Sequence, residues 1–212
     1  MMSMRHRESD MYIQAAKPDQ AGQAAPLIYD TDPALFDYLF TDGHDNALMF
    51  LANEWTQEIS YYSFSHCTAA VRENVLVGIE LGYDQKTLHE CKPNTGLNGI
   101  NSLTPEGIET IVNRVGYLEY LMPPIPDDAY YILFLATHRT VRNLGLGKRL
   151  LANAFDQARN QGYHTCELDV ASNNKAVDFY LGNGMKILSE TRVVPLEQHN
   201  IPSHYRMVKE LS

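Results

Sequence analysis

The seven residues from Arg142 to Lys148, Arg-Asn-Leu-Gly-Leu-Gly-Lys, have the composition of a phosphate-binding turn. They lie between an apolar segment of strand length and a long amphipathic segment, so a strand is expected to turn into a helix here. The first amides of a helix lack intrahelical partners, the helix dipole favours an anion, and glycine lets an oxyanion approach the backbone. The turn therefore predicts a phosphate site, although two glycines also occur in ordinary tight turns.

Two common phosphate motifs do not fit this turn. A P-loop would need Ser or Thr where Arg149 stands, and a dinucleotide fingerprint would need a third glycine where Leu150 stands. The charge around the turn nevertheless favours an anion, because residues 129–155 contain four basic residues and no acidic one, in a chain of net charge −9. The alternative is that these cations form an ordinary solvated face.

Composition narrows the class of protein further. A chain of 212 residues that is 44% hydrophobic and 20% charged can bury one sizeable core, which excludes disordered, collagen-like and coiled-coil classes. The negative net charge argues against a general nucleic-acid binder. The longest apolar run, 129–136, is far shorter than the ~20 residues of a transmembrane helix, and no signal-peptide pattern follows the first residues. The chain has three cysteines, Cys67, Cys91 and Cys166, and no CxxC spacing. This fits a reducing compartment, so we expect a cytoplasmic protein.

The elements that position the turn follow from hydrophobic periodicity. Helices are expected at 45–59, from Thr104 and Pro105 to before Pro123, at 145–161 and at 173–183, with another after Asp19 that Pro26 interrupts or kinks. Strands are expected at 11–15, 62–72, 75–81, 130–137, 165–170, 185–194 and 205–211, the second and third forming a hairpin about Glu73 and Asn74. Residues 84–102 are expected to form an irregular loop. This order predicts an α/β domain with a mixed sheet.

A second motif follows the glycine turn: Asn173-x-x-Ala176-x-x-x-Tyr180-x-x-x-Gly184-Met185. The order of strand, Arg-x-x-Gly-x-Gly, helix, strand and this motif resembles the GNAT superfamily of acyl-CoA-dependent N-acyltransferases. The resemblance is firmest over 130–186, whereas 84–128 matches only by element order and is interpreted as a family-specific insertion. It implies one α+β domain over 1–212, with a mixed, mostly antiparallel sheet flanked by helices. Thr137 and Arg139 depart from the residues that the family often has there, Val and Pro.

The resemblance also implies the cofactor contacts. The backbone of Leu135, Ala136 and Thr137 would pair with the pantetheine arm of acetyl-CoA. The pyrophosphate would bind the backbone of the glycine turn: Arg142, Asn143, Leu144, Gly145, Leu146, Gly147 and Lys148. Asn173 would contact the cofactor or brace its site. Tyr180 would lie near the thioester sulfur and protonate it as general acid, unless it only packs in the core beside Phe179.

The general base and the acceptor site are less well defined by the sequence. Glu80, on the strand next to the motif strand, is the first candidate base, with His138 and Asp169 as the others; a purely structural strand residue is the alternative for Glu80. Residues 18–71 contain eight acidic residues and no Lys or Arg, which favours a cationic acceptor if these acids do more than keep the surface soluble. The acceptor candidates are Tyr29, Asp30, Asp32, Asp37 and Tyr38. No metal site is expected, because adjacent His and Cys residues such as His66 and Cys67 do not form a tetrahedral set.

The sequence therefore predicts an N-acetyltransferase that moves an acetyl group from acetyl-CoA to a primary amine of a cationic small molecule or peptide. Transfer of a longer acyl group is one alternative, and a non-catalytic acyl-CoA sensor or assembly module is another. Neither nucleic acid nor a membrane is expected as a partner. The resemblance is compatible with a homodimer through the terminal strands.

Overall fold

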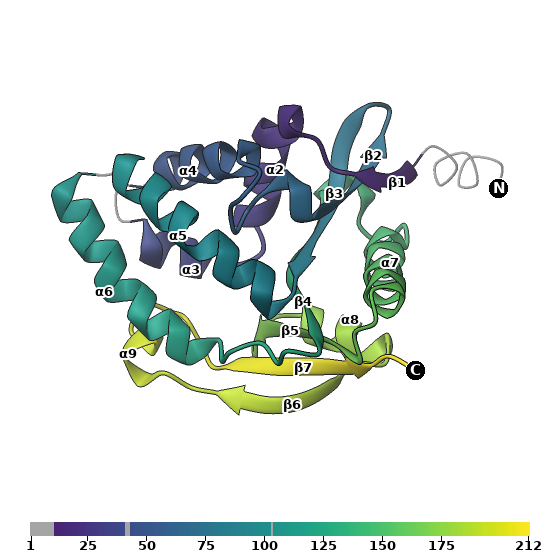
Figure 1. Ribbon diagram of the computed structural model, residues 1–212. Helices are drawn as coiled ribbons and strands as arrows, with labels where there is room; N and C mark the ends of the chain where they lie inside the picture. Colours follow the sequence, from purple (N-terminus) through teal and green to yellow (C-terminus); the bar gives the residue numbers. More distant parts are fainter. Residues whose placement is uncertain (1–10, 41–42, 103) are drawn as a thin grey trace.

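The computed structural model describes residues 11–40, 43–102 and 104–212, and these residues form a seven-stranded sheet (Figure 1). The strand order is β1-β2-β3-β4-β5-β7-β6, and only β4 and β5 pair in parallel. The strands are β1 Met11–Ala15, β2 Cys67–Arg72, β3 Val75–Tyr83, β4 Ala129–Thr137, β5 Thr165–Ala171, β6 Lys186–Thr191 and β7 His204–Glu210. The fold is thus a mixed, mostly antiparallel sheet flanked by helices, as the sequence predicts.

Helices cover both faces of the sheet. The α-helices are α2 Ala21–Tyr29, α3 Pro33–Leu39, α4 His44–Thr56, α5 Gln85–Ser102, α6 Pro105–Leu121, α7 Leu146–Asn160, α8 Ala176–Gly182 and α9 Val194–Glu197. Three short 3-10 turns are η1 Pro18–Gln20, η2 Phe64–His66 and η3 Arg139–Val141. Helices α2, α3, α4 and α6 share one core with β2, β3 and β4, whereas α7 packs on the opposite face (Figure 1).

The sheet opens in its middle, between β4 and β5. Their parallel pairing runs from Ala129↔Thr165 to Tyr131↔Glu167. Beyond this point β4 continues beside β3 to the pair Gly78↔Thr137, and β5 continues beside β7 to the pair Ala171↔His204. The two halves of the sheet are therefore joined at the start of β4 and β5 and diverge toward the glycine turn.

Strong local patterns gave correct predictions. The helix of 145–161 is observed as α7, whose apolar stripe is buried: Leu146, Leu150, Leu151, Ala154, Phe155 and Ala158. The hairpin of β2 and β3 turns through Glu73 and Asn74, whose φ angles of 53° and 64° suit a tight two-residue turn.

No helix of the described residues is long and apolar enough to cross a bilayer.

The expectation of an irregular loop at 84–102 is wrong, because this segment forms helix α5. The Asp84 carboxylate accepts a hydrogen bond from the amide of Thr87 at 2.8 Å and so caps the first turn. Cys91 is buried in the helix, and Leu88 packs against the main core. These contacts outweigh the low helix propensity of Pro93 and the glycines.

Two further differences concern short elements. Helix α3 was not predicted, although Asp32 caps it by accepting from the amide of Leu35 at 3.1 Å and Pro33 occupies its first turn. Strand β2 begins at Cys67 rather than at residue 62, because Ser63 caps the 3-10 turn η2 just before it. Helix α9 was also absent from the prediction, which extended a strand to 194.

Gly82 tests the close packing of β3 against β4. A Cβ atom at Gly82 would lie 2.6 Å from the Tyr130 hydroxyl and 2.7 Å from the Tyr131 carbonyl oxygen. We expect Gly82→Ala to lower the free energy of unfolding by about 1–3 kcal/mol, measured by urea denaturation. The control Gly22→Ala, with nothing within 4 Å of the added atom, should keep or raise stability by up to about 1 kcal/mol. Equal stability of Gly82→Ala and wild type would contradict this packing.

Candidate active site

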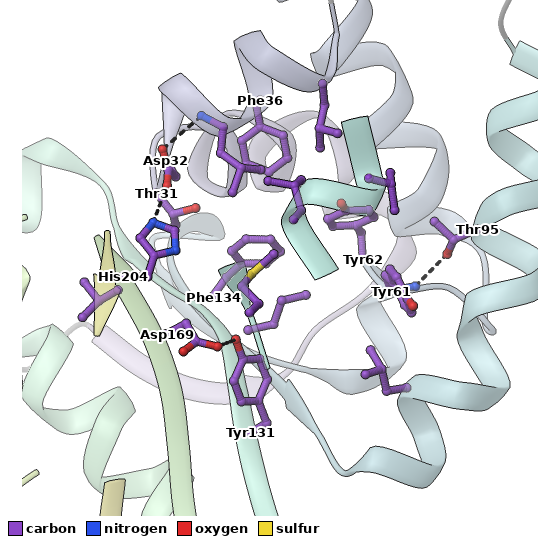
Figure 2. Close-up of a pocket in the computed structure, with 18 of the residues that line it drawn as sticks. Thr31, Asp32, Phe36, Tyr61, Tyr62, Thr95, Tyr131, Phe134, Asp169 and His204 are labelled. Atoms are coloured by element: carbon purple, nitrogen blue, oxygen red, sulfur yellow. Dashed lines mark hydrogen bonds and ion pairs between the residues drawn. The ribbon is translucent and has the colours of Figure 1, made fainter. Parts of the chain in front are cut away.

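A cavity of about 1320 Å³ occupies the opening between β4 and β5 and extends beneath the helices of one face (Figure 2). Its walls come from α3, α5 and α6, from the second half of β4, from the end of β5 and from α8. His204, at the start of β7, also lines it. The cavity thus connects the glycine-turn side of the sheet with the space enclosed by α3, α5 and α6.

The predicted cofactor strand forms one wall of this cavity. Leu135, Ala136 and Thr137 all line it, and they lie beyond the last pair of β4 with β5. On their other side they pair with β3. One edge of β4 therefore faces the opening, where an extended ligand can pair with the strand backbone.

The glycine turn follows this wall directly. Gly145, with φ of 76°, precedes the first residue of α7, and Asn143 also has a positive φ of 65°. A Cβ atom at Gly147 would lie 3.6 Å from the Phe179 ring, so the start of α7 is close to α8. The first amides of α7 are the anion-binding groups that the sequence predicts.

The four cations of 129–155 separate in space. Arg142 and Lys148 are exposed at the turn, and Arg142 also lines the cavity. Arg149 instead donates to the carbonyl of Met11 at 3.1 Å, and Arg139 lies 3.5 Å from the Asp30 carboxylate. The positive charge available to a ligand at the turn therefore comes mainly from Arg142 and Lys148.

The second motif reaches the cavity through α8. Tyr180 is buried and lines the cavity, and burial raises the pKa of its phenol well above the ordinary value. The phenol is therefore protonated at neutral pH and has a proton to donate. Asn173 is exposed and is not among the lining residues; its neighbour Asn174 lines the cavity and accepts a hydrogen bond from the amide of Ala176 at 2.9 Å.

Glu80 lies on the wrong face of the sheet to act as the general base. A Cβ atom at Gly78, two residues earlier on β3, would point at Leu146 and Leu150 of α7, so this side of the strand faces α7. Glu80 is fully buried there and accepts a hydrogen bond from the Tyr130 hydroxyl at 3.0 Å. Burial raises its pKa to about 8. The alternation along β3 directs this side chain away from the cavity, so the structure does not bring Glu80 together with the other predicted site residues, and its role as a base stays a prediction.

The other two candidate bases are engaged elsewhere. His138 is exposed at the end of β4, and its Nδ1 lies 2.8 Å from the Thr140 hydroxyl. Asp169 does line the cavity, but both its oxygens accept hydrogen bonds from Arg206, at 2.8 and 2.7 Å, and one also accepts from the Tyr131 hydroxyl at 2.9 Å. The hydrogen bonds from Arg206 and Tyr131 thus engage both oxygens of this carboxylate.

His204 is a cavity residue that sequence reasoning missed. It is only 4% exposed, and neither ring nitrogen has a hydrogen-bond partner within the described structure. Its Nε2 lies 3.6 Å from the Asp32 carboxylate, as drawn in Figure 2. No local motif marks this histidine, because its partner comes from the cap of α3, far away in the sequence. The pair places a basic nitrogen and a carboxylate on one wall of the cavity.

The predicted acceptor residues divide into two groups. Asp30 and Asp32 line the cavity. Tyr29, Asp37 and Tyr38 do not belong to the lining: the Tyr29 hydroxyl donates to Asp37 at 2.5 Å, and the Tyr38 ring lies 4.9 Å from the Arg114 guanidinium. The hydrogen bond to Asp37 raises the pKa of Tyr29 to about 12. The geometry therefore brings only Asp30 and Asp32 of this set to the cavity.

Comparison with known proteins agrees with this architecture. Residues 107–185 match the model of the Acetyltransferase (GNAT) family. None of the curated proteins matches the sequence.

Solved structures share the fold at low sequence identity. An N-acetyltransferase from Staphylococcus aureus Mu50 has a TM-score of 0.72 at 18% identity, covering 93% of this chain and all of that one. An agmatine N-acetyltransferase mutant has a TM-score of 0.58 at 15% identity, covering 95% of this chain and all of the other. An N-acetyltransferase from Thermoplasma acidophilum in complex with coenzyme A has a TM-score of 0.52 at 14% identity, covering 94% of this chain and 98% of its own.

Proposed function

We propose that this chain is a GNAT superfamily acyltransferase that transfers an acetyl group from acetyl-CoA to a primary amine. The observation that carries the proposal is the opening between β4 and β5, with the strand edge of 135–137 on one side and the glycine turn at its end. The fold neighbours support it: one is an agmatine N-acetyltransferase and another is a complex with coenzyme A.

The chain has residues that fit two parts of acetyl-CoA, the pantetheine arm and the pyrophosphate. The pantetheine arm would pair with the open edge of β4 at 135–137, as an added strand does. The pyrophosphate would bind the first amides of α7, where Gly147 leaves the backbone accessible and the helix dipole favours an anion. Arg142 and Lys148 would add positive charge beside it.

The proposed chemistry needs two proton transfers. Acetyl-CoA supplies a thioester carbonyl to the amine nitrogen, and coenzyme A leaves as a thiol. His204 accepts the proton that the attacking nitrogen loses, because its ring nitrogens are otherwise unpaired, and the Asp32 carboxylate stabilises the resulting imidazolium. Tyr180 donates a proton to the sulfur. After both residues exchange protons with solvent, one proton has moved from nitrogen to sulfur.

The acceptor would arrive as an ammonium ion, which releases one proton to water so that the neutral amine can attack; the second proton of the nitrogen is the one that His204 accepts. Asp30 and Asp32 bring carboxylates to the cavity wall; Arg139 lies 3.5 Å from Asp30, so Asp32 contributes most of the charge that favours a cation. Of the acceptor residues predicted in the acidic segment 18–71, only Asp30 and Asp32 support the proposal. Tyr29, Asp37 and Tyr38 form contacts outside the cavity.

Gly147 tests the proposed pyrophosphate contact. Gly147→Val should lower the affinity for coenzyme A at least about tenfold in isothermal titration calorimetry, because the branched side chain obstructs the first turn of α7. Gly147→Ala is the matched control and should bind more tightly than the valine variant, since its Cβ would be at ordinary contact distance from Phe179. Gly145 is less suitable, because its positive φ would add backbone strain. Unchanged affinity in folded Gly147→Val would refute the contact.

Tyr180 tests the proposed general acid. Tyr180→Phe should reduce kcat by about 10²- to 10⁴-fold, the range for a lost general acid, and should leave the affinity for coenzyme A nearly unchanged. Release of the free thiol during turnover measures the rate. If wild type binds acetyl-CoA but releases no thiol with any amine, the sensor or assembly role replaces the enzyme. Equal rates for wild type and Tyr180→Phe would limit Tyr180 to packing.

His204 tests the proposed general base. His204→Gln should lower kcat by about 10²- to 10⁴-fold, because glutamine cannot accept the proton that the attacking nitrogen loses, and should leave the affinity for coenzyme A nearly unchanged. His164→Gln, a change of an exposed histidine outside the cavity, should keep the wild-type kcat. A wild-type kcat in His204→Gln would assign the base to another group.

A further inference from the structure

The cavity extends well past the reacting groups into a chamber with mainly apolar walls, enclosed by α3, α5 and α6; Lys92 and Glu119, which form an ion pair with each other, also line it. Three aromatic rings of its wall pack against one another: Phe134 lies 6.2 Å from Phe36 and 5.8 Å from Tyr62, measured between ring centroids. In Figure 2 the rings of Phe36 and Phe134 lie between His204 and Tyr62. Aliphatic residues of the helices complete the wall, among them Leu88, Ile111, Val115 and Met122. An ammonium at Asp30 and Asp32 would therefore have an apolar surface beside it.

Glycines in the two helices leave this chamber open. Gly96 and Gly99 of α5 and Gly116 of α6 all line the cavity. A Cβ atom at Gly96 or Gly116 would have no heavy atom within 4 Å. Glycine inside a helix costs about 0.5–1 kcal/mol relative to alanine. Gly96 is exposed to solvent, whereas Gly116 is partly buried, so Gly116 is the position where a small residue leaves space beside the chamber.

We propose that this chamber binds the apolar, ring-bearing body of the amine acceptor, and that the glycines of α5 and α6 set the size it admits. The inference rests on the proposed amine acyltransferase function. An arylalkyl amine matches both halves of the cavity: its ammonium faces Asp30, Asp32 and the unpaired nitrogens of His204, and its ring lies among Phe36, Tyr62 and Phe134. A long acyl chain would pack against the aromatic rings but would make no favourable contact with the carboxylates.

A series of amines tests the substrate class. With acetyl-CoA fixed, kcat/KM should rise about fourfold for each buried methylene from ethylamine to hexylamine, and should be high for phenethylamine. Putrescine and spermidine should be poorer substrates than hexylamine, because they carry further positive charges along or at the end of the carbon chain. Indifference to apolar length, or a preference for the polyamines, would overturn the inference while the transferase function stands.

Filling the chamber tests its position. Gly116→Phe should lower kcat/KM for hexylamine and phenethylamine at least tenfold while ethylamine and the affinity for acetyl-CoA change little. Gly116→Ala, which adds one methyl group, should give a smaller decrease, and Gly22→Phe, in α2 outside the cavity lining, should behave as wild type. If Gly116→Phe does not fold, Gly116→Leu introduces a smaller side chain at the same position.

Two further measurements are needed. The first distinguishes the amine from an acyl chain as the occupant of the chamber, and the second distinguishes failure of the inference from failure of the proposed function. A shift of preference among acetyl-, butanoyl- and hexanoyl-CoA in Gly116→Phe, with the amine preference unchanged, would show an acyl chain in the chamber and overturn the inference. If no amine is acetylated, the proposed function fails, and calorimetry with phenethylamine still decides the inference. Binding to wild type that Gly116→Phe abolishes would support the chamber, and absence of binding to wild type would refute it.

Discussion

The divergence of β4 from β5 is the constraint on which the site depends. Backbone groups inside a protein must find hydrogen-bond partners, and adjacent strands normally provide them. Here the pairing ends at Tyr131↔Glu167, so the edge of β4 at 135–137 is directed into a cavity. The same divergence makes room for Tyr180 and for the chamber beyond it. A ligand that pairs with this edge therefore completes the sheet while it positions its reactive end.

A buried ionic cluster stands at the point where the strands separate. Arg206 of β7 is 4% exposed and binds Glu167 at 2.9 Å and Asp169 at 2.7 Å, both on β5. Asp169 in turn accepts from Tyr131, the last residue of β4 that pairs with β5. Removing one partner from such a cluster costs about 3–5 kcal/mol, because the remaining charges are buried without compensation. The cluster thus links three strands at the junction and positions the walls of the cavity.

The two faces of the sheet have different roles. On one face the apolar stripe of α7 closes a tight core, in which Glu80 is buried against Tyr130. On the other face α5 and α6 meet the sheet around open space, with glycines where side chains would fit. A residue's strand therefore matters less to its chemistry than the face to which it points. This is why His204, at the start of β7, lines the cavity, whereas Glu80, in the middle of β3, is buried against Tyr130.

The sequence by itself determined the elements whose signals are local: the stripe of α7, the tight turn at Glu73 and Asn74, and the glycine turn between a buried strand and a helix. Each depends on residues within a few positions, so periodicity and turn chemistry were sufficient. Helix α5 was decided by tertiary structure, because burial of Cys91 and Leu88 overrides the local preference of Pro93. The same distinction between local signals and tertiary packing applies to the site. The strand edge and the glycine turn that we propose for the cofactor come from contiguous motifs. The pairing of His204 with Asp32 and the direction of Glu80 toward α7 depend on which strands and helices pack together, and no short stretch of sequence contains that information.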